Sequence, residues 1–340
     1  MKKRILSALT AAAATIVPAS AFDVKIDNIY YNIINGEYLE VTAITDYPAY
    51  SGDQLDVAPI NPTASQTTPN DYSGDIVIPD SVTVDGYEKK LPVKTIRTSA
   101  FANTTELISV TLPETITRIG SSVFAHSSIK KLDMSKAKLQ YIPSWTCYRC
   151  TEAVDVTMPD GLEDIGEGAF MQSNITEITI PESTEYIGNQ AFMLCHKITA
   201  VHGGRNVTKY GYYCFSKTSL STVVIHEALR DMSNAFTLNI NLKNVICHKS
   251  DPDDFDGYFS FHNSNPNCTL WVPDESLELY KASSQWTSFF KDIRPMSQGL
   301  PQAAASDPED IRYFDMNGRQ VPDPKPGHVY ITDRHKKILY

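Results

Sequence analysis

Two cysteines, three positions apart, offer the clearest opportunity for chemistry in this chain of 340 residues. Cys147 and Cys150 have the C-x-x-C spacing that redox motifs and zinc sites use. Structural zinc takes four ligands. The sequence has no second C-x-x-C, and its eight histidines form no pair at ligand spacing. We therefore expect no metal at this pair.

An acidic segment is the second candidate. It reads DPDDFDG and carries four aspartates: Asp251, Asp253, Asp254 and Asp256. A calcium-binding loop places oxygen ligands at set positions and ends on a glutamate. Here Phe255 stands at the third ligand position and His262 at the last one. The pattern therefore favours a solvated loop over a metal site.

Common catalytic signatures are missing from the sequence. It contains no G-x-S-x-G, P-loop or H-E-x-x-H pattern. We therefore expect a protein that is not an enzyme, with no catalytic residues and no cofactor.

One short phrase recurs along most of the chain and indicates its architecture. Its copies are IRTSAF, IGSSVF, IPSWTC, IGEGAF, IGNQAF, YGYYCF and DMSNAF, ending at Phe101, Phe124, Cys147, Phe170, Phe192, Phe215 and Phe236. These end positions are 23, 23, 23, 22, 23 and 21 residues apart. A fixed period of this length is typical of a leucine-rich-type solenoid, in which each coil buries its apolar face against the next.

A second phrase, L-x-x-V-x-L-P, keeps the same period, with copies from residues 107–113 to 269–273. Its alternating apolar residues predict a short strand with one buried face, and proline ends the strand because it has no N–H to donate. The glycine after the isoleucine is expected to serve a tight turn. In the copy at residues 198–205, His-Gly-Gly replaces the proline, which predicts a local irregularity.

These patterns predict an α/β-type leucine-rich repeat solenoid of about seven to eight coils, each of 22–23 residues. Parallel strands would form one face, short helical or irregular arcs the other, and inward phenylalanines a column between them. Most of the cysteines occupy positions of the same repeat. We expect them to be unpaired and buried, because free thiols pack like small apolar groups.

The two phrases together resemble the BspA-like leucine-rich repeat family over residues 72–295. Residues 72–82 and 91–96 look like its usual lead-in, and residues 268–295 look like its C-terminal cap. In that cap Tyr280, Trp286 and Phe290 would close the open end of the core. The resemblance implies an exported or surface protein of Bacteroidales-type bacteria, with adhesion to host matrix proteins as its activity.

The N-terminal region departs from the repeat. Residues 1–21 combine a basic start, an apolar run and the small-residue site Ala19-Ser20-Ala21, which is typical of a secretory signal peptide. Residues 22–92 are β-rich and are expected to cap the first coil, with residues 46–72 as a long loop. The solenoid with its C-terminal cap would then span residues 93–295.

The C-terminal region has two candidate interpretations. Residues 296–312 are small and polar and indicate a linker. Residues 313–340 resemble tails of exported proteins in the same bacteria, some of which are type IX sorting signals. The matching residues are Asp315, Gly318, Arg319, Gly327 and Tyr330. The alternative is a small β-hairpin appendage with no sorting role.

Charge and hydropathy limit the partners. Loss of Lys2, Lys3 and Arg4 with the signal peptide would take the formal net charge from −10 to −13, which disfavours nucleic acid and anionic membranes. No later apolar run reaches the ~18 residues of a transmembrane helix. We expect a monomer exported to the cell surface or the medium, with the periplasm as an alternative. Its partner would be a host or bacterial surface protein or glycan.

Strand alternation places two rows of side chains on the outward face of the sheet. The first row is Ser109, Lys131, Asp155, Glu177, Ala200, Thr222, Asn244 and Thr269. The second is Thr111, Asp133, Thr157, Thr179, His202, Val224, Ile246 and Trp271. The last four residues of the second row would form a ladder of mainly apolar side chains, and exposed apolar surface marks interaction sites.

We take His202, Val224, Ile246, Trp271, Glu177 and Thr179 as the candidate ligand-binding residues. The alternative is that residues 249–267 or the C-terminal tail cover this ladder. The function favoured by the sequence is adhesion-like binding of a protein or glycan. A structural surface spacer without a specific ligand is the alternative function.

Overall fold

The computed structural model describes residues 22–43, 71–150, 152, 154–254, 256 and 259–300, together with four strands of the C-terminal tail. The signal peptide expected at residues 1–21 and most of the loop expected at 46–72 lie outside the described residues. The same holds for Asp315, Gly318, Arg319 and Gly327 of the tail motif. No helix among the described residues is long and apolar enough to cross a membrane.

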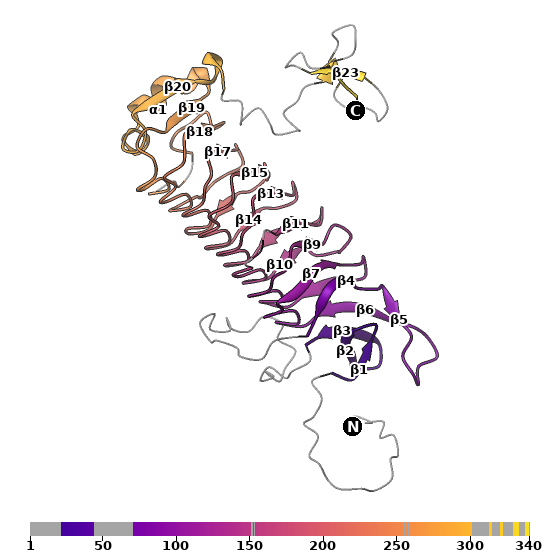
Figure 1. The fold of residues 1–340 in the computed structure, drawn as a ribbon. Coiled ribbons are helices and arrows are strands. Elements are labelled where there is room, and N and C mark those ends of the chain that lie inside the picture. Colours follow the sequence, from indigo (N-terminus) through magenta and orange to yellow (C-terminus); the bar gives the residue numbers. More distant parts are fainter. Residues whose placement is uncertain are drawn as a thin grey trace.

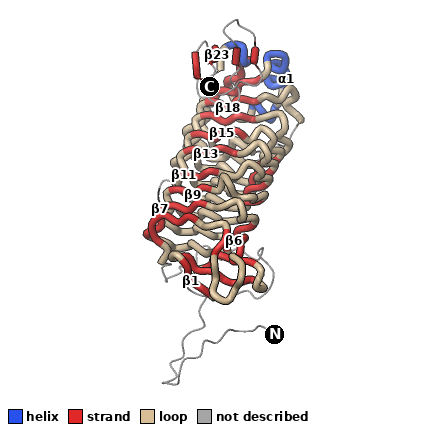
Figure 2. The backbone as a smooth tube through the Cα atoms, turned by 90° about the vertical axis from the view of Figure 1, so that its right-hand side faces the viewer, coloured by secondary structure: helices blue, strands red, loops and turns tan. Residues whose placement is uncertain are grey.

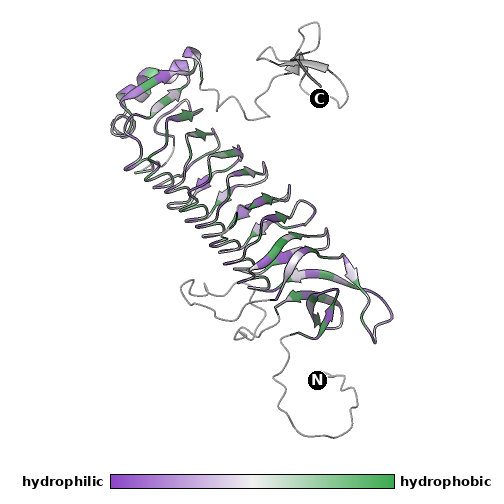
Figure 3. Cartoon of the chain, in the orientation of Figure 1, coloured by the Kyte–Doolittle hydropathy of each residue, from purple (hydrophilic) through white to green (hydrophobic). Residues whose placement is uncertain are grey.

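The coils stack into an elongated solenoid of about nine turns, which confirms the expected fold class (Figure 1). Each coil contributes one short strand to a main face, and consecutive strands that pair do so in parallel. These strands are β4 (Ser73–Val77), β7 (Glu106–Thr111), β9 (Lys131–Asp133), β11 (Asp155–Thr157), β13 (Glu177–Ile180), β15 (Ala200–Gly203), β17 (Thr222–Ile225), β18 (Asn244–Cys247), β19 (Thr269–Val272) and β20 (Asp292–Pro295). Apolar residues recur along these strands from coil to coil (Figure 3).

The main face is not one continuous sheet. Its strands pair in three groups, β4-β7-β9-β11, β13-β15 and β17-β18-β19-β20. The ladder is therefore interrupted between β11 and β13 and again between β15 and β17. The second interruption follows the His-Gly-Gly sequence, so the local irregularity predicted there is confirmed.

A second parallel ladder runs along another side of the stack, and sequence reasoning missed it. It consists of the two-residue strands β10 (Tyr141–Ile142), β12 (Asp164–Ile165), β14 (Tyr186–Ile187) and β16 (Lys209–Tyr210), while β8 (Arg118–Ile119) pairs with β6 (Leu91–Ile96). The isoleucine of the I-G phrase thus lies in a strand. Two residues are too few to show alternation, so the sequence pattern predicts no strand there.

The glycine after that isoleucine has a different role from the one expected. Gly188 does not adopt a positive φ, and a Cβ built on it would lie 2.7 Å from the carbonyl carbon of Gly166 in the preceding coil. A Cβ on Gly211 would lie 2.4 Å from the backbone nitrogen of Asn189. Glycine is therefore required by the close approach of neighbouring coils, not by turn geometry.

The arcs opposite the main face are irregular and not helical (Figure 2). Each coil places two residues in the left-handed region, two positions before and two positions after the column residue, with φ of 53–62°. The residues before the column are Ser99, Ser122, Trp145, Gly168, Gln190, Tyr213, Asn234 and Phe259, and those after it are Asn103, His126, Arg149, Gln172, Leu194, Lys217, Leu238 and Asn263. Backbone hydrogen bonds between coils offset this strain: Gln190 N–H, for example, donates to Tyr212 O at 2.8 Å.

The expected phenylalanine column fills the space between the strands and the arcs. Its rings stack nearly parallel from coil to coil, with centroid distances from 5.0 Å for Phe192–Phe215 to 5.7 Å for Phe236–Phe261. Cys147 stands in the column between Phe124 and Phe170, and all these side chains are buried. The column is the continuous core that holds the coils together.

All six cysteines are free and buried, which confirms the expected packing role. Two of them also satisfy backbone acceptors: the thiols of Cys150 and Cys195 donate to Phe124 O at 3.2 Å and to Phe170 O at 3.0 Å. Burial raises the thiol pKa of Cys195 and of Cys247 to about 11, and that of Cys268 to about 12. These thiols are therefore protonated and unreactive at neutral pH.

A β-sheet covers the N-terminal end of the stack. The strands β1 (Val24–Ile26), β2 (Ile29–Ile34) and β3 (Tyr38–Thr42) are antiparallel, and β3 pairs in parallel with β6, which also pairs with β5 (Ser81–Val82). Tyr72 joins this sheet to the column: its hydroxyl donates to Thr42 O at 2.7 Å, and its ring lies 4.5 Å from that of Phe101.

Short helices close the C-terminal end, namely η1 (Asp274–Ser276), α1 (Leu277–Ala282) and α2 (Ser284–Thr287). Tyr280, Trp286 and Phe290 are buried there, as predicted for the cap. After η2 (Met296–Gln298) the tail contains a further antiparallel sheet of order β22-β21-β23-β24: β21 (Tyr313–Phe314), β22 (Gln320–Val321), β23 (Val329–Thr332) and β24 (Lys337–Leu339).

Candidate binding face

The outward rows of the main face follow the register predicted by alternation. Ser109 pairs with Lys131 and Lys131 with Asp155, while Asn244 pairs with both Thr222 and Thr269. In the second row Thr179 pairs with His202, and Ile246 with both Val224 and Trp271. The interruption after β15 separates His202 from Val224, so the six candidate residues lie on two sheets and not on one ladder.

The candidate residues on β13 and β15 are polar and accessible. The Glu177 side chain is 68% exposed, and its Oε2 lies 3.8 Å from Nε2 of His202. Thr179 is exposed, and it pairs with His202 across the two strands. This part of the face therefore offers a carboxylate, a hydroxyl and an imidazole to a ligand.

Trp271 lies on the outward face but is held down against it. It is 7% exposed and does not belong to the inner core cluster that contains its neighbours Leu270 and Val272. Its indole Nε1 donates to Oδ1 of Asn244 on β18 at 3.0 Å. On the other side, the guanidinium of Arg294 on β20 lies 5.7 Å from the ring centroid.

The position of Trp271 accounts for the burial of Ile246. Ile246 is 1% exposed although it too lies outside the inner core cluster. Asn244 precedes Ile246 by two residues on the same face of β18, so an indole that reaches Asn244 from β19 must pass over Ile246. The two residues form a small closed apolar cluster, while Val224 on β17 is only half-buried.

An ion pair fixes the strand that flanks Trp271. Asp292 accepts from Arg294 Nε at 2.9 Å and from Thr269 Oγ1 at 3.0 Å. Arg294 is the main reason that the pKa of Asp292 lies below its usual value. The cation above the indole is therefore anchored by its own carboxylate.

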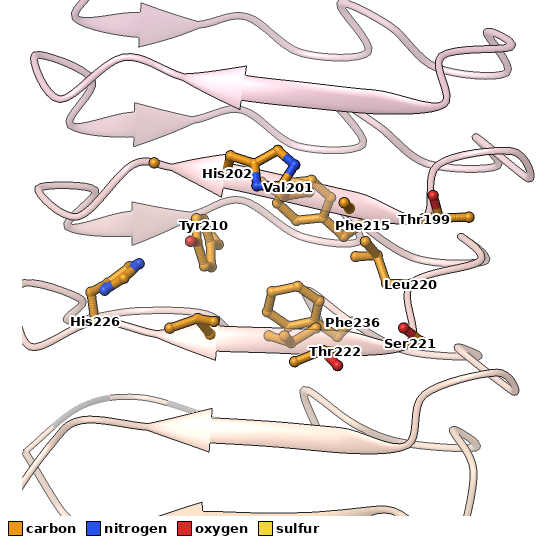
Figure 4. Close-up of a pocket in the computed structure, with 14 residues that line it drawn as sticks. Thr199, Val201, His202, Tyr210, Phe215, Leu220, Ser221, Thr222, His226 and Phe236 are labelled. Atoms are coloured by element: carbon orange, nitrogen blue, oxygen red, sulfur yellow. The ribbon is translucent and has the colours of Figure 1, made fainter. Parts of the chain in front are cut away.

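A cavity of about 120 Å³ lies in the interruption between β15 and β17 (Figure 4). It is lined by outward residues such as His202, Thr222 and Val224 and also by the core rings Tyr210, Phe215 and Phe236. The cavity therefore leads from the outward face to the aromatic column.

Gly203 lines the cavity at the end of β15, and its backbone conformation requires glycine. Its register partner is Ile180, an inward residue that is 2% exposed, and the next strand carries the buried Ile225 near its end. With φ +68° a Cβ on Gly203 would collide with Ile180 O of β13 at 2.3 Å. Larger residues are thus excluded at this position of the cavity wall.

The hydroxyl of Thr222 is a buried polar group at this cavity. Its Oγ1 has no hydrogen-bond partner among the described residues, although the oxygen is shielded from solvent. An unpaired buried hydroxyl is unfavourable, so a ligand that hydrogen-bonds it would gain free energy of binding. The cavity and this hydroxyl were not predicted, although the glycine at an inward strand position is visible in the sequence.

The acidic segment at residues 251–256 is used for internal pairing. Asp254 accepts from the buried Nζ of Lys249 at 2.8 Å and from Arg230 Nη1 at 2.6 Å. Lys249 is the main cause of the lowered pKa of Asp254. Within the described part of the chain, no three histidine, cysteine or acidic residues are grouped to hold a metal ion.

Comparison with known proteins gives a family match. The model of the "BspA type Leucine rich repeat region" matches six copies over residues 87–193 and 163–265. Among solved structures, the chain is similar to a leucine-rich repeat protein from Bacteroides ovatus, with 19% identity, 81% of this chain and 76% of that chain covered, and a TM-score of 0.44. It is also similar to a leucine rich cell surface protein from Faecalibacterium prausnitzii, with 17% identity, 86% and 98% coverage, and a TM-score of 0.27. None of the curated proteins compared with the chain matches it.

Proposed function

Because the chain belongs to the BspA-type leucine-rich repeat family, we propose that it is an exported, non-enzymatic protein that binds a surface protein or glycan. Export is supported by the signal-peptide pattern of residues 1–21. Adhesion is what the family resemblance implies, and the matched repeats cover more than half of the chain.

The observation that carries the proposal is the accessible part of the outward face beside the ladder interruption. Glu177, Thr179, His202 and Val224 lie there on adjacent strands and offer charge, hydrogen bonds and apolar surface together. A rigid strand face is a suitable support for such a site, because the register fixes the spacing of the side chains. In this proposal Ile246 and Trp271 form the closed apolar floor next to the contact residues.

Binding is tested with one protein probe and one glycan probe. The full chain without its signal peptide is passed over immobilised fibronectin and over immobilised mucin, and saturable binding to either is expected. Glu177→Lys should weaken that binding at least tenfold. Glu185→Lys is the matched control, since Glu185 is also exposed and belongs to the same coil but precedes β14 on another side of the stack. Equal loss in both variants, or no saturable binding to either probe, contradicts the proposal.

Surface display is tested by protease shaving of intact cells, followed by blotting for the chain. If residues 313–340 are a sorting signal, the wild type is cleaved and a variant ending at Gln298 is not. Cleavage of both forms would contradict the sorting role and favour the appendage interpretation. Protection of both forms would favour the periplasm and contradict adhesion. Abundant surface protein that binds neither probe would instead favour the spacer function.

A further inference from the structure

We propose that the cavity between β15 and β17 binds one uncharged aromatic ring, supplied as the phenylalanine side chain of a partner protein. This inference rests on the proposed function, because it names the group that a partner would insert at the same outward face. Four features of the cavity support it: its size, its charge, its aromatic floor and the closure of the ladder at both ends.

The size of the cavity suits one ring. A cavity of 150 Å³ engineered into another protein stays dry and binds benzene, and the present one is slightly smaller at about 120 Å³. A single six-membered ring therefore fits, whereas two fused rings exceed the available space. A pyranose with its hydroxyl groups is also larger than benzene, which disfavours a glycan at this position.

The lining of the cavity disfavours an ion. The lining contains two imidazoles, His202 and His226, but none of the described lining residues carries a carboxylate, an ammonium or a guanidinium group. The inner wall consists of Val201, Val223, Leu220 and the aromatic rings. Desolvating a charged group against such a wall would be strongly unfavourable.

The floor of the cavity prefers an aromatic ring over an aliphatic group. Phe215 is stacked between Phe192 at 5.0 Å and Phe236 at 5.5 Å. Phe236 is likewise stacked between Phe215 and Phe261. Tyr210 also lines the cavity, and its ring lies perpendicular to both, at 5.8 Å from Phe215 and 5.6 Å from Phe236. An aromatic ligand can add edge-to-face or offset contacts to this group of rings, which an aliphatic group cannot make.

The closure of the ladder determines what can enter. On one side of the interruption Ser219 N–H donates to Ile198 O at 3.1 Å, and on the other Arg230 N–H donates to Thr208 O at 2.7 Å. A strand inserted between β15 and β17 would need about 4.8 Å on each side, which these bonds do not permit. A side chain can enter the cavity while the partner's main chain stays outside the closed ladder.

The first experiment measures the binding of small probes to the full chain. Toluene is titrated while the methyl resonances of Val201, Leu220 and Val223 are followed by NMR. Saturable shifts confined to these methyls are expected, and naphthalene should produce none because it exceeds the cavity. The absence of saturable shifts with toluene, or equal shifts with naphthalene, would overturn the proposal. This experiment uses the wild-type protein, so its outcome does not depend on the folding of a variant.

The second experiment fills the cavity with a ring of the protein's own. Val201→Phe should weaken toluene binding at least tenfold. Thr157→Phe is the control, because it adds the same ring to an exposed position of the main face on β11, away from the cavity, and it should leave toluene binding unchanged. Toluene binding that survives in a folded Val201→Phe variant would overturn the proposal.

Two blocked amino acids test whether the cavity accepts the side chain of a protein and whether it prefers an aromatic side chain to an aliphatic one. N-acetyl-phenylalaninamide should shift the same methyls and should bind more tightly than N-acetyl-leucinamide. Equal or tighter binding of the leucine compound overturns the aromatic preference, and binding of toluene alone overturns a protein side chain as the source. Capture of fibronectin that is lost in Glu177→Lys but kept in Val201→Phe would retain the proposed function and overturn the role of the cavity.

Discussion

The indole Nε1 of Trp271 donates a 3.0 Å hydrogen bond to Oδ1 of Asn244 on the neighbouring strand of the main face. This bond fixes the indole of Trp271 across β18, where the ring buries Ile246. Trp271 is the largest outward side chain of the sheet β17-β18-β19-β20. The apolar part of the face is therefore closed by one of its own members, whose indole is held by this hydrogen bond and flanked by the guanidinium of Arg294.

Removing that contact should open the cluster. Asn244→Leu leaves the indole N–H without an acceptor, at a cost of about 1 kcal/mol in the free energy of unfolding. We expect faster hydrogen exchange of the Trp271 indole N–H and a lower melting temperature. Asn244→Asp keeps an acceptor oxygen and should preserve slow exchange. Unchanged exchange in Asn244→Leu would show that other contacts hold the ring.

The close approach of adjacent coils gives a second prediction. In Gly211→Ala the new Cβ would lie 2.4 Å from the backbone nitrogen of Asn189, so the coils must separate. We expect a loss of about 1–3 kcal/mol in the free energy of unfolding, as for overpacked cores. Gly161→Ala is the control: its Cβ meets nothing within 4 Å, so its stability should be equal or slightly higher. Equal stability of both variants, measured by urea unfolding, would contradict a packing role for Gly211.

The repeat made much of this fold predictable. The 22–23-residue period predicted the stack, the alternation predicted the outward rows, and the column position predicted the burial of Phe192 and Cys147. Each of these inferences follows from a side chain that must be either buried or exposed. Such information is present in the residue types themselves.

The features that escaped prediction depend on the backbone. The left-handed residues of the arcs include Trp145 and Leu194, which have no intrinsic preference for that region. They are held there by hydrogen bonds between coils, which no local sequence pattern encodes. The cavity lies where the ladder is broken between β15 and β17, and a missing ladder becomes visible only when strand positions are known.

Burial of the thiols predicts that the native protein resists alkylation. Burial shields all six thiols from the reagent, and iodoacetamide reacts with thiolate, which the raised pKa of Cys195, Cys247 and Cys268 disfavours. We expect no incorporation by the native chain at pH 8 and six equivalents after unfolding in guanidinium, counted by mass spectrometry. Rapid labelling of Cys147 or Cys150 in the native state would show that the C-x-x-C pair is accessible and would reopen a redox role.

The ion pair between Asp292 and Arg294 on β20 predicts that the stability of the fold decreases at acidic pH. The pKa of Asp292 in the folded protein lies below its unfolded value, chiefly because Arg294 hydrogen-bonds the carboxylate. Its contribution is therefore present above the unfolded pKa of about 3.9 and is lost as the pH falls through the lower folded value. The urea midpoint of Asp292→Asn should lie below that of the wild type at pH 6, and the gap should shrink by pH 3. A constant gap would mean that Asp292 acts through packing alone.

Lys249 gives the last prediction, because a buried ammonium must keep its partners. Its side chain is 2% exposed, and Nζ donates to Glu227 O at 3.0 Å and to Leu229 O at 2.9 Å while pairing with Asp254. Lys249→Met removes these donors and leaves buried carbonyl oxygens unsatisfied, which should cost about 1–3 kcal/mol.

Lys281→Met is the matched control for that variant. Lys281 pairs with Glu278 at 3.0 Å, but its side chain is 47% exposed, so the change should alter the free energy of unfolding by less than about 0.5 kcal/mol. Both values are measured by urea unfolding at pH 7. If the two variants lose the same stability, Lys249 does not hold the acidic loop to the coil of Leu229, and the burial of its ammonium has another cause.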